Sequence, residues 1–226
     1  MKEDSRGKII VSIGGGHATG SVELANVIRQ SLVKKYKQSD IRIIDLDSKV
    51  DKLNRKYSNA DFDFESLYVE LTTNDKDNVG KNEQGDDPCE IIFVCGCYSL
   101  YDEKIRSISK LKVYLDSDAD KRLINLIQFN KIETPTELSG LLSEYMDNLR
   151  DEMIKHIEPT RVYADLIIPY TNETIGSAIM LDGISKVIEE LKGNDKVINL
   201  EHNKIPLLNF EAERIDVQKS RYYDLS

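Results

Sequence analysis

The stretch that decides the fold is SIGGGHATGSVELA, residues 12–25. It begins inside a short apolar run at residues 8–13, KIIVSI, which is typical of a buried strand and is followed by Gly14, Gly15 and Gly16. From residue 20 to residue 36 the apolar positions follow helical spacing instead, as Val22, Leu24, Ala25, Ile28, Leu32 and Val33. The stretch therefore predicts a strand, a glycine-rich turn and a helix.

The same alternation continues along the chain. Further apolar runs lie at residues 41–46, 90–95, 110–115 and 164–169. Each is too continuously apolar to be half exposed, which favours strands in a sheet that is covered on both faces. Helical patterns cover residues 137–157 and 173–191. The sequence predicts an α/β fold with a doubly wound, five-stranded parallel sheet and flanking helices.

The length and composition indicate one sizeable core, because the chain has 226 residues and is 40% hydrophobic. We expect a main domain over residues 1–192 and a C-terminal extension over 193–226. Residues 73–88 are polar, acidic and glycine-bearing, which predicts a mobile loop. No run approaches the roughly 18 apolar residues of a membrane span, so neither membrane insertion nor export is expected.

Charge and cysteine content restrict the partners and the compartment. A formal net charge of −9 offers no basic face to a phosphate backbone, so nucleic acid is not expected as the main partner. The 3 cysteines, Cys89, Cys95 and Cys97, favour a reducing compartment, the cytoplasm or the nucleus. Cys95 and Cys97 lack the C-x-x-C spacing of a metal site, which favours buried thiols at a strand end and no metal.

The glycine-rich turn also resembles a phosphate-binding loop, G-x-x-x-x-G-K-[ST], in which backbone N–H groups surround phosphates at the start of a helix. Gly15 and Gly20 fit the pattern, but Ser21 and Val22 stand where the lysine and the metal-holding hydroxyl belong. The alternative interpretation is a tight turn without a ligand. The candidate nucleotide-binding residues are Gly15, Gly16, His17, Ala18, Thr19, Gly20 and Ser21.

Longer segments resemble the uridine/cytidine kinase family. They are VYLDSDADKRL (113–123) and EPTRVYADLIIP (158–169), with GGGHATGS (14–21), DLDS (45–48) and FDFESL (62–67) around them. The resemblance implies a P-loop kinase fold, ATP and Mg²⁺ as cofactors, and a pyrimidine salvage reaction. In that reaction the γ-phosphoryl group of ATP moves to the 5′-hydroxyl of uridine or cytidine.

The resemblance places Asp47 where the family has the aspartate that accepts the proton of the nucleoside hydroxyl. A carboxylate within hydrogen-bond reach of that hydroxyl would orient it for in-line attack. The alternative is that Asp47 only caps the loop after its strand, as aspartates commonly do. Asp47 is therefore the candidate catalytic residue, with both interpretations open.

Other positions depart from the family pattern. Besides Ser21 and Val22, Lys49 and Val50 replace the aromatic pair after the aspartate, and Cys95 stands where the resemblance implies a carboxylate near the metal. The segment that aligns with the arginine-rich lid, residues 125–137, contains no arginine and has Lys131 as its cation. We therefore expect impaired catalysis, with nucleotide binding through the backbone retained.

Two functions remain open after this comparison. One is a diverged uridine/cytidine kinase, and the other is a non-catalytic regulator or scaffold that acts through a protein partner or as a homo-oligomer. Among the remaining side chains, His17 is predicted to be solvated, with phosphate contact as the alternative. Asp116, Asp118 and Asp120 are predicted to cap a helix and not to bind a metal, and Arg161 is predicted to pair with a surface acid.

Overall fold

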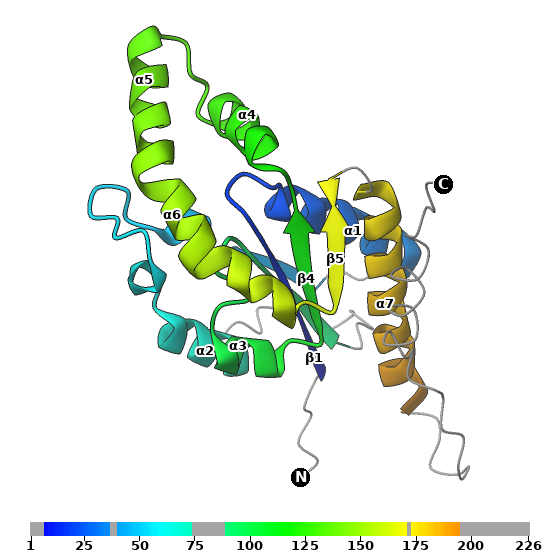
Figure 1. The fold of residues 1–226 in the computed structure, drawn as a ribbon. Coiled ribbons are helices and arrows are strands. Elements are labelled where there is room, and N and C mark those ends of the chain that lie inside the picture. Colours follow the sequence, from blue (N-terminus) through cyan, green and yellow to red (C-terminus); the bar gives the residue numbers. More distant parts are fainter. Residues whose placement is uncertain (1–6, 37–39, 74–88, 171–172, 195–226) are drawn as a thin grey trace, which may run out of the picture. The chain divides into compact units, whose positions relative to one another are not determined.

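The computed structural model describes residues 7–36, 40–73, 89–170 and 173–194. They form a five-stranded, all-parallel sheet with the order β2-β3-β1-β4-β5 (Figure 1). The strands are β1 (Gly7–Gly15), β2 (Ile41–Asp45), β3 (Cys89–Cys95), β4 (Leu111–Asp116) and β5 (Leu166–Pro169). The predicted five-stranded parallel sheet is confirmed, and each strand lies within two residues of its predicted run.

Two helical layers cover the sheet because successive strand residues point to opposite faces. Ile9, Val11 and Ile13 pack with buried residues of α1 (Ser21–Tyr36) and α7 (Glu173–Asn194). Ile10 faces the other way and packs with α2 (Phe64–Thr72) and α3 (Glu103–Ile108). Both faces are therefore buried, which explains the continuously apolar strands.

A long helical segment follows β4. After α4 (Ala119–Phe129), α5 (Pro135–Glu144) starts at a capping box in which Thr134 and Glu137 bond each other's backbone N–H groups. The predicted helix over 137–157 is only partly right. The chain is helical there, but π-helical turns at Tyr145–Leu149 and Met153–Ile157 flank the short α6 (Arg150–Glu152). A 3₁₀ segment, Glu158–Tyr163, then leads to β5.

The strand order positions the candidate site. The connection after β1 runs to β2 on one side of the sheet, and the connection after β3 runs to β4 on the other side. All the strands are parallel, so the segments after β1, β2, β3 and β4 meet at one edge. In open α/β sheets, ligands bind in the crevice at such a switch point. The glycine-rich turn, Asp47 and the Cys95–Cys97 turn all follow strands at this edge.

Some expectations concern residues outside the described ranges. Residues 74–88 of the predicted loop and residues 195–226 of the predicted extension lie there. The division into residues 1–192 and 193–226 stays a prediction. Within the described residues, none of the helices carries an apolar run long enough to cross a bilayer.

Candidate active site

The glycine-rich loop wraps around the start of α1 in a conformation that its glycines permit. Gly15 has φ +152°, and a Cβ there would lie 2.7 Å from the Leu115 carbonyl oxygen. The Thr19 hydroxyl donates to the Gly16 carbonyl at 2.8 Å, and Ala18 adopts a left-handed φ of 55°. The helix that follows starts at Ser21, and the first N–H groups of a helix have no partner within it. The loop can therefore present backbone donors to an anion.

Two side chains of α4 lie against this loop, and neither was assigned a role from the sequence. Asn125 donates from Nδ2 to the Ala18 carbonyl at 2.8 Å. Arg122 donates to the Ser117 carbonyl and crosses Gly16 so closely that a Cβ there would lie 2.5 Å from Arg122 Cδ. Arg122 stands in the matched segment DADKRL, which was the available signal. The loop thus has a neighbouring cation from another element.

Asp47 lies directly across from this loop, at the start of a short 3₁₀ turn (Asp47–Lys49) after β2. Its Oδ1 accepts from the backbone N–H of Cys97 at 3.0 Å, and the Cys97 thiol lies 3.4 Å from Oδ2. Gly96 permits this approach, because a Cβ there would lie 2.9 Å from Asp47 Oδ1. The turn itself is capped by Asp45, whose Oδ1 accepts from the Asp47 and Ser48 N–H groups at 3.1 and 3.3 Å.

The environment of Asp47 favours a carboxyl that binds protons more readily than usual. Desolvation by the surrounding protein raises its pKa, against the opposing effects of the Cys97 hydrogen bonds and of His17. The residue is nevertheless exposed, so a ligand can reach it. A carboxyl with these properties can accept a proton from a bound hydroxyl.

His17 is buried, so the expectation of a solvated loop histidine is wrong. Its side chain enters a polar cluster: Nδ1 lies 3.3 Å from Cys97 Sγ, and Nε2 lies 3.1 Å from Glu152 Oε2. Nothing in the local pattern around His17 indicates this contact, because Glu152 lies 135 positions further along the chain, in a segment whose pattern predicts an amphipathic helix. Through Cys97, His17 connects the glycine-rich loop with Asp47.

Glu152 is the centre of that cluster and is only 2% exposed. In addition to this close contact with His17, it accepts hydrogen bonds from Arg55 Nη2 at 2.9 Å and from the Tyr98 hydroxyl at 3.1 Å. Burial pushes the pKa of Glu152 upward, but the contacts with His17, Arg55 and Tyr98 outweigh it, and the pKa is lowered. The buried carboxyl is therefore held in its charged form.

The contacts of the cysteines, of Asp116 and of Asp118 are those of structural residues. All three cysteines are buried and none forms a disulfide, and burial raises the pKa of Cys95 far above its ordinary value. Asp116 pairs with Arg161 at 2.9 Å, which confirms the surface pairing predicted for Arg161. Asp118 occupies the N-cap position of α4, as predicted, but its side chain makes no capping hydrogen bond. The described residues contain no cluster of three ligands suited to a metal ion.

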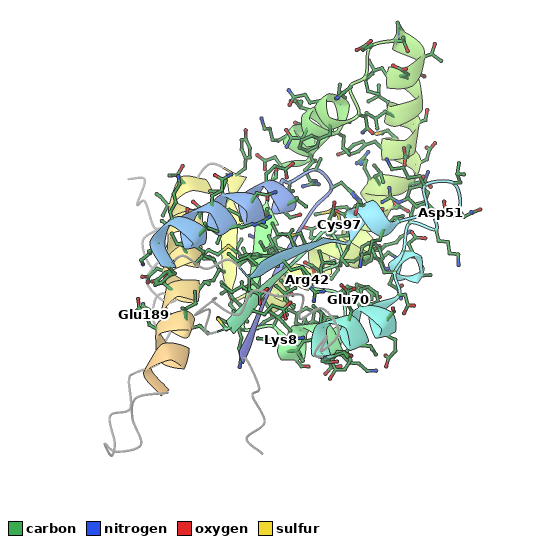
Figure 2. All side chains as sticks on the ribbon, turned by 180° about the vertical axis from the view of Figure 1, so that it is seen from behind. Lys8, Arg42, Asp51, Glu70, Cys97 and Glu189 are labelled. Carbon is green, nitrogen blue, oxygen red and sulfur yellow. The ribbon has the colours of Figure 1, made fainter. Side chains whose placement is uncertain are left out.

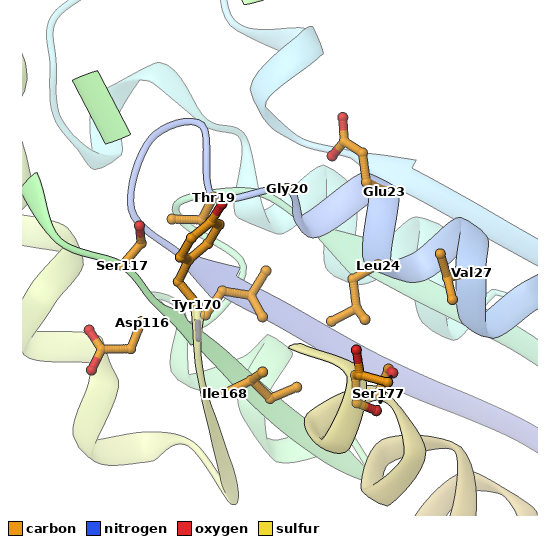
Figure 3. Close-up of a pocket in the computed structure, with 12 residues that line it drawn as sticks. Thr19, Gly20, Glu23, Leu24, Val27, Asp116, Ser117, Ile168, Tyr170 and Ser177 are labelled. Carbon is orange, nitrogen blue, oxygen red and sulfur yellow. Dashed lines mark hydrogen bonds between the residues drawn. The ribbon is translucent and has the colours of Figure 1, made fainter. Parts of the chain in front are cut away.

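A cavity of about 350 Å³ opens beside the loop, between α1 and the start of α7 (Figure 3). Its lining combines apolar side chains with hydroxyl and carboxyl groups and consists of Thr19, Gly20, Glu23, Leu24, Val27, Leu115, Asp116, Ser117, Ile168, Tyr170, Thr174 and Ser177. Lys121 Nζ lies 4.5 Å from the centre of the Tyr170 ring at its rim. The size and composition suit a flat, partly polar ligand group next to the loop.

The fold and this edge define a P-loop kinase. A shikimate kinase from Bacteroides thetaiotaomicron has the same fold, with a TM-score of 0.51 and 13% identity over 78% of this chain and 98% of that one. The family model described as Phosphoribulokinase / Uridine kinase family matches residues 71–175. The Saccharomyces cerevisiae protein described as "Putative uridine kinase DAS2" is 45% identical over 97% of this chain and 96% of its own length. The chain belongs to the phosphoribulokinase/uridine kinase family.

Bacterial relatives match a shorter part of the chain. A uridine kinase from Limosilactobacillus reuteri is 30% identical over 105 residues, which are 46% of this chain and 47% of that protein.

Proposed function

We propose that this chain binds a nucleoside triphosphate with its phosphates at residues 15–21 and its base in the adjoining cavity. Asp47 then accepts the proton of the 5′-hydroxyl of a pyrimidine nucleoside, uridine or cytidine. The observation that carries the proposal is the placement of the Asp47 carboxylate, which is held by the Cys97 N–H at 3.0 Å. Cys97 in turn contacts His17 of the loop, so a single residue, Cys97, bridges the phosphate-binding loop and the proposed base.

The same site favours slow turnover. Phosphoryl transfer relies on positioned cations, and a single such arginine contributes about 10³–10⁵ in rate. Here Ser21 and Val22 replace the loop lysine and hydroxyl, and residues 125–137 contain no arginine. Arg122 supplies one cation beside Gly16, which supports reduced rather than absent transfer.

The side chains at the positions where the family binds Mg²⁺ are poor ligands for that ion. The ion prefers oxygen ligands in octahedral geometry. The Val22 side chain offers no oxygen, and Cys95, which stands where the family has a carboxylate, offers a fully buried thiol whose pKa is raised. These residues do not fit a protein-bound Mg²⁺ site, and no step is assigned to the ion.

The test is ADP release from ATP with uridine, cytidine and a purine nucleoside as acceptors. Asp47→Asn should reduce pyrimidine-dependent release by about 10²–10⁴-fold with unchanged ATP affinity. Asp51→Asn is the matched control, because Asp51 lies in the same segment and is exposed (Figure 2). Release that is equal in the wild type and in Asp47→Asn would refute the role of Asp47.

The second candidate function is a non-catalytic regulator that acts through a protein partner or as a homo-oligomer. The replacement of the loop lysine by Ser21 is the observation that favours it. This function predicts no nucleoside-dependent ADP release and, in the cell, an unchanged phenotype for Asp47→Asn. The three buried cysteines, none of them in a disulfide, are consistent with placement in the cytoplasm or nucleus.

A further inference from the structure

The cluster around Glu152 places several ionisable side chains in the protein interior. One carboxylate, with a side chain 1% exposed, is shared by Arg55 and by His17, which adds a second positive charge when it is protonated. Burying ions is costly, and a buried carboxylate is kept only where partners compensate it. Glu144, 3.8 Å from Arg55 Nη1, adds a second and more exposed carboxylate at the edge of the cluster.

The cluster lies beside the path that a phosphoryl group would take. His17 belongs to the glycine-rich loop, and its other nitrogen contacts Cys97, which holds Asp47. Its field reaches Asp47, because the positive charge on His17 acts to lower the pKa of that carboxyl. The positive charge therefore flanks the space between the proposed donor and acceptor.

Arg55 retains unused donor capacity. Its Nη2 contacts Glu152 at 2.9 Å and its Nη1 lies 3.8 Å from Glu144, while the guanidinium stacks over Tyr57 at 4.7 Å. Its Nε is buried and has no hydrogen-bond partner within the described residues. Buried donors are nearly always paired in native structures, so an unpaired one points to an acceptor that is not part of the chain.

We propose that His17 and Arg55, held by the positioning residue Glu152, supply the positive charge for the terminal phosphate that the loop no longer supplies through a lysine. The inference rests on the proposed function, since it needs a nucleoside triphosphate at the loop. Fixed charges in a site with little water act strongly on developing charge without rearrangement. The cluster would therefore distinguish ATP from ADP more than it affects binding of the nucleoside part.

The experiment compares ATP with ADP by isothermal titration on the full chain. His17→Gln and Arg55→Gln should each reduce the ratio of ATP to ADP affinity by about tenfold or more, the scale of a charged hydrogen bond. Arg55→Lys keeps a cation and should retain more of the ratio than Arg55→Gln does. Glu152→Gln should also lower it, since both cations lose their anchor.

Glu144→Gln is the control, because Glu144 lies 3.8 Å from Arg55 and is more exposed than Glu152. The glutamine can still accept the hydrogen bond that the Tyr57 hydroxyl donates to Glu144 at 3.1 Å. It should leave the ratio within about twofold. If Glu152→Gln does not fold, the His17 and Arg55 variants still decide the matter. A wild type that binds ATP, together with His17 and Arg55 variants of unchanged ratio, overturns this inference alone. A wild type that binds neither nucleotide overturns the proposed function and this inference with it.

Discussion

The donor side and the acceptor side of this site have diverged in different ways. On the donor side, residues 15–21, the backbone keeps the loop form through Gly15 and the Thr19 to Gly16 hydrogen bond, while the lysine position holds Ser21. On the acceptor side, Asp47 and its support by Cys97 and Gly96 are present. The backbone form of the loop is thus present without the lysine charge, and Arg122 of α4 is a cation that another element brings next to Gly16.

The acceptor side gives the largest expected effect, through pH. A base must be deprotonated to act, and the pKa of Asp47 is raised by desolvation. Turnover should therefore fall as the pH drops through that raised pKa, about tenfold per pH unit, beginning above the range of an ordinary aspartate. The measurement is a pH profile of kcat/KM for uridine. An acid limb at or below the ordinary aspartate value would contradict the assignment.

Glu152, which contacts His17 of the loop, should give the largest change in the free energy of unfolding among these substitutions. Glu152→Gln removes the charge that compensates His17 and Arg55 and should cost about 3–5 kcal/mol in the free energy of unfolding. Glu144→Gln should cost less than about 1 kcal/mol, since its contact with Arg55 is long and less buried. Urea unfolding of both variants at neutral pH makes the comparison.

The stability difference between the wild type and Glu152→Gln should depend on pH. The pKa of Glu152 is lowered in the folded state, so its stabilisation is present above the unfolded pKa and is lost as the pH falls through the folded pKa. The stability difference between the wild type and Glu152→Gln should therefore shrink under acid. A difference that stays constant with pH would show that packing, not charge, is what the substitution removes.

The backbone of the donor side can be tested by replacing glycine with alanine at two positions, one in the loop and one in α5. Gly15→Ala places a Cβ 2.7 Å from a backbone oxygen at φ +152° and should destabilise by about 2–3 kcal/mol. Gly140→Ala, in α5, meets nothing within 4 Å and should stabilise by about 0.5–1 kcal/mol. Thermal unfolding separates the two, and equal effects would mean that the loop backbone is not constrained.

The smallest effect is expected on the outer face of the helical segment that carries Glu152. Lys155 pairs with Asp151 at 2.7 Å, but both side chains are more than 60% exposed. Asp151→Asn should change the free energy of unfolding by no more than about 0.5 kcal/mol, and less in high salt. A larger loss would remove the contrast between the inner and outer faces.

Sequence patterns were sufficient for the sheet because its strands are short, apolar and buried on both faces. They also indicated the loop, since Gly15 and Gly20 are needed for its backbone. They could not indicate the Glu152 cluster. Its members come from the loop, from residue 55, from the turn after β3 and from a late helix, and nothing in the local spacing of Arg55 or Tyr98 marks them as neighbours.

The same limit explains the error on His17. A histidine between glycines has no local reason to be buried, and only the arrival of Glu152 gives its ring a partner. The π-helical turns at Tyr145–Leu149 and Met153–Ile157 could not be predicted either, since the apolar spacing of this segment fits an ordinary α-helix. Sequence reasoning found Asp47 through a resemblance to known kinases, not through its spacing.

The strand order has a consequence for synthesis of the protein. β1 precedes both of its sheet neighbours in the chain, because it pairs with β3 and β4 and with neither edge strand, and Gly7 lies opposite Cys89. The first of these neighbours, β3 (Cys89–Cys95), is therefore absent until residue 95 has been translated. During that interval the apolar segment at residues 8–13 has no sheet to join and is a natural client for chaperones.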